Sequence, residues 1–211
     1  MIVNEIFHSI QGESTRAGLP CVFVRLTGCN LRCVYCDTAY AFHEGTEMSL
    51  DDVERAVAKH DCPFVTVTGG EPLAQPEVHT LVRRLADLGY DVQIETGGSL
   101  DISVVDPRAR VILDIKTPGS GMMERCDRGN LDRLRPGDEV KFVLMGRPDY
   151  EWAVGLLKAR PLPEGVPVLM SPAHGTLDPR DLAEWMKRDA LRARLHLQIH
   201  KYIWGPDARG V

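Results

Sequence analysis

Short apolar runs alternate with amphipathic runs along most of the chain. Runs rich in Val, Ile, Leu and Phe predict strands at 21–26, 64–68, 92–96, 111–115, 140–144, 166–170 and 195–199. Helical spacing of apolar residues predicts helices at 50–60, 77–88, 150–159 and 179–189. Ser49 and Asp178 suit helix N-caps, and Gly89 suits a helix end.

Strands that alternate with helices are typical of βα units and of a parallel sheet. The predicted strands are too few for a complete eight-stranded barrel. We therefore expect an α/β fold, a partial, open βα barrel of about six parallel strands. A doubly wound sheet is the alternative. No linker is visible, so residues 1–211 are expected to form a single domain.

Polar and Gly-rich segments follow the predicted strands. In either fold, ligands bind at the carboxyl ends of parallel strands, so we expect these segments to surround one site. They are residues 27–29, 68–72, 95–98, 116–118 and 171–175.

Composition is that of an ordinary globular protein. The 211 residues carry a formal net charge of −5, with 44% apolar and 26% charged residues. No run approaches the roughly 20 apolar residues that cross a membrane, and the N-terminus lacks a signal pattern. We therefore expect a cytoplasmic protein without membrane contact. Scattered Lys and Arg in an acidic chain argue against general nucleic-acid binding.

Three of the six cysteines form a C-x3-C-x2-C motif at Cys29, Cys33 and Cys36. Three thiolates on one loop can converge on a metal centre, and iron–sulfur clusters are held by thiolates, usually four of them. With three close ligands, one iron of a 4Fe–4S cluster keeps an open position for a substrate or cofactor. A structural zinc site is the alternative, and it needs a fourth ligand. The possible fourth ligands are Cys21, Cys62 and His43; the two cysteines also suit the core, and Cys126 suits a free thiol.

The cysteine motif, with Tyr35 before its third cysteine, resembles that of the radical S-adenosylmethionine (SAM) superfamily. A second motif, Thr68-Gly69-Gly70-Glu71-Pro72, resembles the GGEP element of these enzymes. The resemblance implies a radical SAM core and a 4Fe–4S cluster whose open iron is chelated by SAM. Reduction then cleaves SAM to methionine and a 5′-deoxyadenosyl radical. Paired glycines suit close approach of the backbone to a ligand, and Glu71 suits an acceptor for the methionine ammonium.

Three further stretches, residues 7–14, 36–38 and 198–205, resemble the 7-carboxy-7-deazaguanine synthase family. The resemblance extends from about residue 5 to 205. It implies a lyase of queuosine and deazapurine biosynthesis that converts 6-carboxy-5,6,7,8-tetrahydropterin to 7-carboxy-7-deazaguanine with loss of ammonia. The radical takes the hydrogen at C6 and SAM is re-formed. Mg²⁺, an external flavodoxin- or ferredoxin-type reductant and a homodimer are also implied.

The resemblance assigns roles position by position. The implied cluster ligands are Cys29, Cys33 and Cys36, and the implied Mg²⁺ ligand is Thr38, for which an N-cap is the alternative. The implied SAM contacts are Tyr35, Asp37, Gly69, Gly70, Glu71, Lys116, Thr117, Pro118, Ser171, Pro172, Ala173 and His174. The implied substrate contacts are Ile10, Gln11, Gly12, Glu13, Arg25, Thr68, Glu95, His200 and Val211. A guanidinium such as that of Arg25 pairs well with a substrate carboxylate.

The chain departs from the family pattern in three places. Ser14 stands where a glycine is expected, and a positive φ there would strain a serine. The chain continues through residues 206–211, whereas some members use a terminal carboxylate near 206 as a substrate contact. Either this tail folds in with Val211, or the contact is absent or replaced. Residues 119–137, rich in Gly, Met and charge, have no assigned role.

Two other functions remain open at this point. A radical activase that takes hydrogen from a glycine of a partner enzyme shares the cysteine loop. A non-enzymatic zinc or iron–sulfur protein would need a fourth close ligand and would have no use for the Gly-Gly-Glu-Pro motif.

Overall fold

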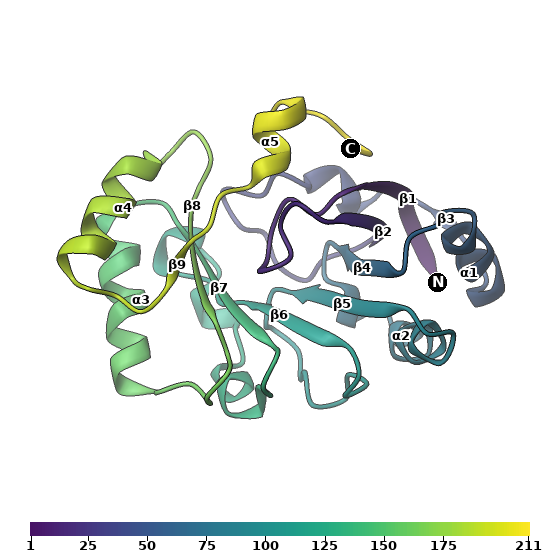
Figure 1. The fold of residues 1–211 in the computed structure, drawn as a ribbon, viewed down its shortest axis with the longest axis horizontal. Coiled ribbons are helices and arrows are strands. Elements are labelled where there is room, and N and C mark those ends of the chain that lie inside the picture. The colour runs from purple at the N-terminus through teal and green to yellow at the C-terminus, as the bar shows by residue number, and fades with distance from the viewer.

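A computed structural model describes residues 1–211 (Figure 1). One nine-stranded sheet has the order β3-β1-β2-β4-β5-β6-β7-β8-β9. Neighbouring strands from β2 to β9 are parallel, and β1 is antiparallel to β2 and β3. The strands are β1 (Ile2–Ile10), β2 (Pro20–Leu26), β3 (Thr46–Glu47), β4 (Phe64–Gly69), β5 (Asp91–Thr96), β6 (Arg110–Asp114), β7 (Glu139–Leu144), β8 (Val168–Pro172) and β9 (Arg194–Leu195).

The sheet does not close, because β3 and β9 form its two edges. The prediction of an open, partial βα barrel is therefore confirmed. Helices α1 and α2 pack beside the β1–β5 part and α3 and α4 beside β7–β9, while α5 lies apart, above the sheet (Figure 1). The α-helices are α1 (Leu50–Ala58), α2 (Val78–Asp87), α3 (Arg147–Ala159), α4 (Pro179–Arg188) and α5 (Ile199–Trp204). Short 3-10 turns are η1 (Ala39–Phe42), η2 (Pro72–Ala74), η3 (Pro118–Ser120), η4 (Met123–Arg125) and η5 (Arg128–Arg133).

The residues predicted to begin or end helices, Ser49, Asp178 and Gly89, are confirmed in these places. The Ser49 hydroxyl accepts a hydrogen bond from the Asp52 amide, and the Asp178 carboxylate accepts one from the Arg180 amide. Gly89 follows α2 with a φ of +86°, a backbone conformation that favours glycine. None of the helices is long and apolar enough to span a membrane.

Two predictions at the ends of the chain were incomplete or wrong. Strand β1 was missed because most of its side chains are only half-buried, so neither a buried run nor a clean alternation marks it. The strand predicted at 195–199 is limited to Arg194–Leu195, and Ile199 already begins α5. The chain leaves the sheet after His196, and the Ile199 amide donates to the Gly12 carbonyl.

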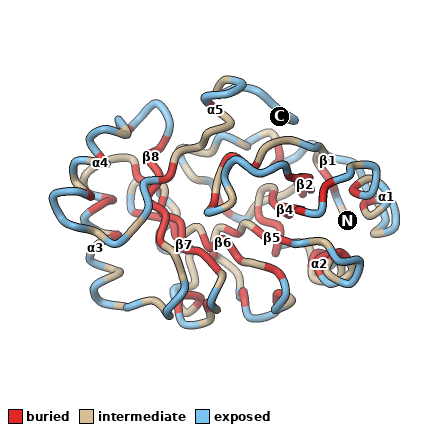
Figure 2. Tube along the Cα trace, in the orientation of Figure 1, coloured by how far each residue is buried: buried red, intermediate tan, exposed pale blue.

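Smaller differences concern two boundaries. Helix α3 begins at Arg147 rather than Tyr150, with Pro148 in its first turn, where a proline is well tolerated. Strand β8 is displaced to 168–172. Figure 2 shows that burial is concentrated in β2 and β4–β8 and on the inner faces of α1 and α2, whereas α5, apart from the buried Lys201, and the tail are half-buried or exposed.

The end of β4 lies directly against the end of β2. A Cβ atom on Gly69 would be 2.2 Å from the Leu26 carbonyl oxygen, and one on Gly70 would be 2.2 Å from the Gly28 oxygen. Gly69 also has a φ of +147°. The paired glycines therefore allow two backbone segments of the protein to meet, which places the start of the cysteine loop beside the Gly-Gly-Glu-Pro motif.

The strain expected at Ser14 is present. This buried residue has a φ of +65°, in the left-handed region. Its hydroxyl accepts a hydrogen bond of 3.1 Å from the Arg16 amide, which holds the turn.

We predict that Gly69→Ala destabilises the fold by about 2–4 kcal/mol, because the new methyl group meets backbone and the residue keeps a strained φ. Gly155→Ala is the matched control, since open space surrounds this α3 position. It should stabilise the protein by up to about 1 kcal/mol through helix propensity. Urea unfolding under reducing conditions, followed by circular dichroism, measures both changes. Equal stabilities of the two variants would contradict the close-approach role of Gly69.

Candidate active site

A cavity of about 750 Å³ lies at the carboxyl ends of the parallel strands. This volume is in the range of small-molecule sites, about 300–1,000 Å³. Its walls come from the ends of β1, β2, β4, β5, β6 and β7, from the segment after β8, from the cysteine loop, from α5 and from residues 206–211. The predicted site residues that line it are Ile10, Gln11, Gly12, Glu13, Arg25, Cys29, Cys33, Tyr35, Cys36, Asp37, Thr38, Thr68, Gly69, Gly70, Glu95, Lys116, Ala173, His174, His200 and Val211.

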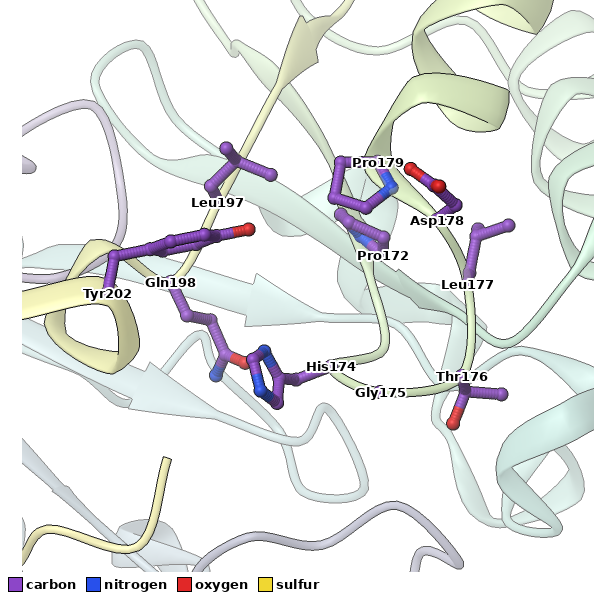
Figure 3. A pocket seen from close by; sticks show the side chains of 10 residues that line it. All are labelled: Pro172, His174, Gly175, Thr176, Leu177, Asp178, Pro179, Leu197, Gln198 and Tyr202. Atoms are coloured by element: carbon purple, nitrogen blue, oxygen red, sulfur yellow. The ribbon is translucent and has the colours of Figure 1, made fainter. Parts of the chain in front are cut away.

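Five of the implied SAM contacts do not line this cavity: Glu71, Thr117, Pro118, Ser171 and Pro172. Thr117 is buried and its hydroxyl donates to the Val143 carbonyl at 3.0 Å. Pro172 instead lines a smaller hollow of about 380 Å³ between the β8–α4 loop and α5 (Figure 3). His174 and Gln198 line both spaces, so the smaller hollow adjoins the main cavity.

The three cysteines of the motif are free, half-buried thiols that line the cavity. Burial raises the pKa of Cys33 to about 11 and also raises the pKa values of Cys29 and Cys36. No three His, Cys, Asp or Glu side chains are grouped around a single ion position. In a 4Fe–4S cluster each thiolate binds a different iron, so three separate thiols around one cavity fit the cluster.

The possible fourth zinc ligands lie elsewhere. Cys21 and Cys62 are buried in the core, as predicted, and the Cys21 thiol contacts the Thr66 hydroxyl at 3.1 Å. His43 does not line the cavity. Cys126 is a free, half-buried thiol that accepts a hydrogen bond of 3.4 Å from the Lys116 amide. A four-ligand zinc site is therefore not supported by the placement of these residues.

Glu71 is bonded within the protein rather than facing the cavity. Its carboxylate accepts hydrogen bonds from the Thr96 hydroxyl at 2.8 Å, from the Gly97 amide at 2.8 Å and from the Leu73 amide at 3.1 Å. Burial raises its pKa, although these donors favour the ionised form. The structure shows Glu71 bonded within the protein, and its contact with the methionine ammonium stays a prediction. The carboxylate joins the end of β4 to the end of β5 and so shapes the cavity wall indirectly.

The Gln-Gly-Glu loop is fixed from three sides. The Gln11 amide donates to the Thr66 hydroxyl at 3.0 Å, and its oxygen accepts from the Glu13 amide at 3.0 Å. Gly12 lies against α5, where an added Cβ would be 2.0 Å from Nδ1 of His200. Gly12 is thus required by packing, which the sequence pattern alone did not reveal.

Charged side chains gather in the interior of the cavity. The Lys141 ammonium lies 2.5 Å from Glu13 and 3.6 Å from Asp114, and Asp114 lies 2.9 Å from Lys116. Burial opposes the ionisation of Glu13, but the ion pair with Lys141 outweighs it and holds the pKa of Glu13 far below its usual value. The pKa of Glu95 is raised to about 7, mainly because this carboxyl is buried.

Arg25 is also paired. Its guanidinium lies 2.7 Å from Glu5, which in turn accepts a hydrogen bond of 2.9 Å from the Tyr40 hydroxyl. The Arg209 guanidinium lies 3.9 Å from the centre of the Tyr40 ring. Residues 206–211, including Val211, line the cavity beside this group. The tail therefore folds over the site.

The residues after the third cysteine connect the cluster loop to α5. The Thr38 hydroxyl donates to Asp37 at 2.9 Å and makes no N-cap bond, so the N-cap alternative is not supported. Asp37 also accepts from Lys201 at 2.5 Å and from Gln198 at 3.2 Å. Burial opposes its ionisation, but Lys201 lowers the pKa of Asp37.

Sequence analysis gave no site role to several residues that line this cavity. They are Lys141, Asp114, Tyr40, Gln198 and Lys201. Lys141 did carry a signal, because it is a charged residue inside the apolar run 140–144, as Arg25 is inside 21–26.

Comparison with known proteins agrees with this geometry. Residues 23–118, which contain both motifs, match the radical SAM superfamily. The open barrel and its three-thiol cavity thus define a radical SAM protein, a class that uses a 4Fe–4S cluster and SAM. The chain is 47% identical to the 7-carboxy-7-deazaguanine synthase of Chlorobaculum tepidum, covering 99% of this chain and 96% of the relative. It is 43% identical to that of Koribacter versatilis, with both chains fully covered.

The chain belongs to the 7-carboxy-7-deazaguanine synthase family. The crystal structure of QueE from Escherichia coli has the same fold, with a TM-score of 0.78 at 24% identity over 93% of this chain and 92% of that chain. These findings do not favour the radical activase or the non-enzymatic metal protein.

We predict that Glu71→Gln lowers stability by about 1–3 kcal/mol, because an amide NH₂ would face N–H donors in place of an acceptor oxygen. Glu77→Gln, at an exposed position without a capping bond, should change stability by less than about 0.5 kcal/mol. Urea unfolding measures both. A Glu71→Gln variant of wild-type stability with weakened SAM binding would instead support the ammonium-binding role.

The raised pKa of Glu95 predicts a pH-dependent contribution to stability. The unfolded carboxyl has its ordinary pKa of 4.5 and the folded one about 7, so the folded state binds the extra proton between these values. The stability of the wild type relative to Glu95→Gln should therefore fall as pH rises from about 4.5 to about 7. His196, whose pKa burial lowers to about 4, titrates in both proteins and cancels in the difference. Parallel pH profiles of the two ligand-free proteins in urea unfolding would contradict a raised pKa.

Proposed function

We propose that this protein converts 6-carboxy-5,6,7,8-tetrahydropterin to 7-carboxy-7-deazaguanine and ammonia. One observation carries this proposal. The three cluster thiols line the same cavity as the Gln-Gly-Glu loop, Arg25 and Glu95. Full-length similarity to 7-carboxy-7-deazaguanine synthases supports the choice of reaction.

Cys29, Cys33 and Cys36 would hold the 4Fe–4S cluster. When bound, the cluster and SAM supply the electron and the hydrogen-abstracting group for the reaction. Tyr35, Asp37, Gly69, Gly70, Lys116, Ala173 and His174 would surround SAM, since they line the cavity around the thiols. Glu71 would hold the end of β5 beside this region, because it accepts hydrogen bonds from Thr96 and Gly97.

The pterin would lie toward the Gln-Gly-Glu loop. The Glu13 carboxylate is an acceptor for the donor-rich aminopyrimidine edge, and the Arg25 guanidinium suits the substrate carboxylate. Thr68, Glu95 and His200 would complete the contacts, with Ile10, Gln11 and Gly12 forming the loop. Thr38 would bind Mg²⁺ through its hydroxyl, with substrate and water as further ligands. The tail would place Val211 near the substrate, because it lines the same cavity.

The protein would take its electron from an external flavodoxin- or ferredoxin-type reductant. It would act as a homodimer, for which the exposed apolar residues Tyr202, Ile203 and Trp204 on α5 offer contact surface. We propose the cytoplasm as its location.

An anaerobic assay tests the proposed reaction. Protein reconstituted with iron and sulfide receives SAM, dithionite, Mg²⁺ and 6-carboxy-5,6,7,8-tetrahydropterin, and mass spectrometry follows 7-carboxy-7-deazaguanine. The wild type should form product and Cys33→Ala should form none, because a cluster ligand is lost. Cys62→Ala is the matched control, since this buried thiol lies away from the cavity. Accumulation of 5′-deoxyadenosine and methionine without the pterin, and no product with it, would show that the substrate is wrong.

A further inference from the structure

Lys141 lies among the charged side chains of the cavity and has no place in the proposed SAM and pterin contacts. It is on β7, its side chain is 9% exposed, and it lines the cavity. Its ammonium donates to one oxygen of Glu13 at 2.5 Å, and Gln198 donates to the other oxygen at 2.7 Å. Glu13 is therefore held at both oxygens by groups from two different parts of the chain.

The surrounding charges explain why this pairing matters. Three carboxylates, Glu13, Asp114 and Glu95, share this buried region with the ammonium groups of Lys141 and Lys116. Without Lys141, three carboxylates would face a single ammonium, and burial would drive one of them to bind a proton. A protonated Glu13 would present an O–H donor in place of an acceptor.

The strand fixes the position of this ammonium. Lys141 is paired in register with Asp114 on the neighbouring strand β6, and the ammonium groups of Lys141 and Lys116 both contact the same Asp114 oxygen, Oδ2. Lys141 therefore approaches Glu13 from the sheet, which is the rigid part of the site, whereas Glu13 belongs to a loop.

We propose that Lys141 is a positioning residue, which holds Glu13 as an oriented carboxylate that accepts from the aminopyrimidine edge of the substrate. This inference rests on the proposed function and on the place of the pterin beside Glu13. Lys141 itself has no part in the radical chemistry.

Kinetics of Lys141→Met, Lys141→Arg and Lys187→Met test this role. Loss of the ammonium should raise KM for the pterin about 30-fold or more, because a buried charge loses its partner. The kcat value should stay within about threefold of wild type. Arg should restore most of the affinity. Lys187→Met, an exposed control on α4, should match the wild type. Equilibrium dialysis of the pterin against reconstituted protein with SAM and no reductant should show the same ranking.

The pH profile separates positioning from a merely structural role. The groups that face Glu13 are Lys141 on β7, Asp114 on β6, Glu95 on β5, His196 after β9, His200 on α5 and Asp37 after the cysteine loop. Without Lys141 the pKa of Glu13 rises, so Glu13 loses its negative charge as pH falls. The ratio of KM in Lys141→Met to KM in wild type should therefore increase from pH 8 toward about pH 5.5. A pH-independent ratio, or a fall in kcat with KM unchanged, would overturn the inference.

The same substitution made in a Glu13→Gln variant provides a second test if Lys141→Met alone does not fold. Glu13→Gln is neutral and needs no ammonium, so adding Lys141→Met to it should change pterin KM by less than about threefold. An equally large effect in both backgrounds would overturn the inference. A wild-type enzyme that forms no product would overturn the proposed function and this inference with it. Product formation by the wild type with an unchanged KM in Lys141→Met would overturn the inference alone.

Discussion

Charge buried inside an open sheet must be paired, and this requirement organises the site. Glu13, Lys141, Asp114 and Lys116 form a continuous series of ion pairs from the Gln-Gly-Glu loop to the end of β6. Each group taken from water needs a partner at short range, so the loop, β7 and β6 are fixed relative to one another. The position of the Gln-Gly-Glu loop is therefore a property of the whole interior and not of the loop alone.

Backbone contacts provide the second part of this organisation. Gly69 and Gly70 bring the end of β4 against Leu26 and Gly28, just before the first cysteine. Glu71 then ties this junction to β5 through Thr96 and Gly97. The glycines of the Gly-Gly-Glu-Pro motif thus bring two strand ends together in addition to lining the cavity. The two glycines permit the contact between β4 and β2, and the glutamate links the same strand end to β5 by hydrogen bonds.

The sequence predicted the interior of the fold well because buried parallel strands are continuous apolar runs. Strands β2 and β4–β7 lie close to where such runs predicted them, and their ends carry the cavity. Strand β1 and helix α5 were not predicted. Most side chains of β1 are half-buried, whereas α5 combines buried, half-buried and exposed side chains and begins with a bond to a distant partner, the Gly12 carbonyl. The sequence also could not predict which residues after a strand reach the cavity: Glu71 and Thr117 follow strands like their neighbours, yet they do not line it.

The contact between Gly12 and His200 limits how this protein can vary in evolution. The two residues are far apart in the chain, but a Cβ atom at position 12 would occupy the place of the imidazole ring. A larger residue at 12 is therefore compatible only with a smaller one at 200 or with a displaced α5. The two positions should therefore change together or not at all. Covariation of residues 12 and 200 among relatives would reflect the limited space between the loop and the helix.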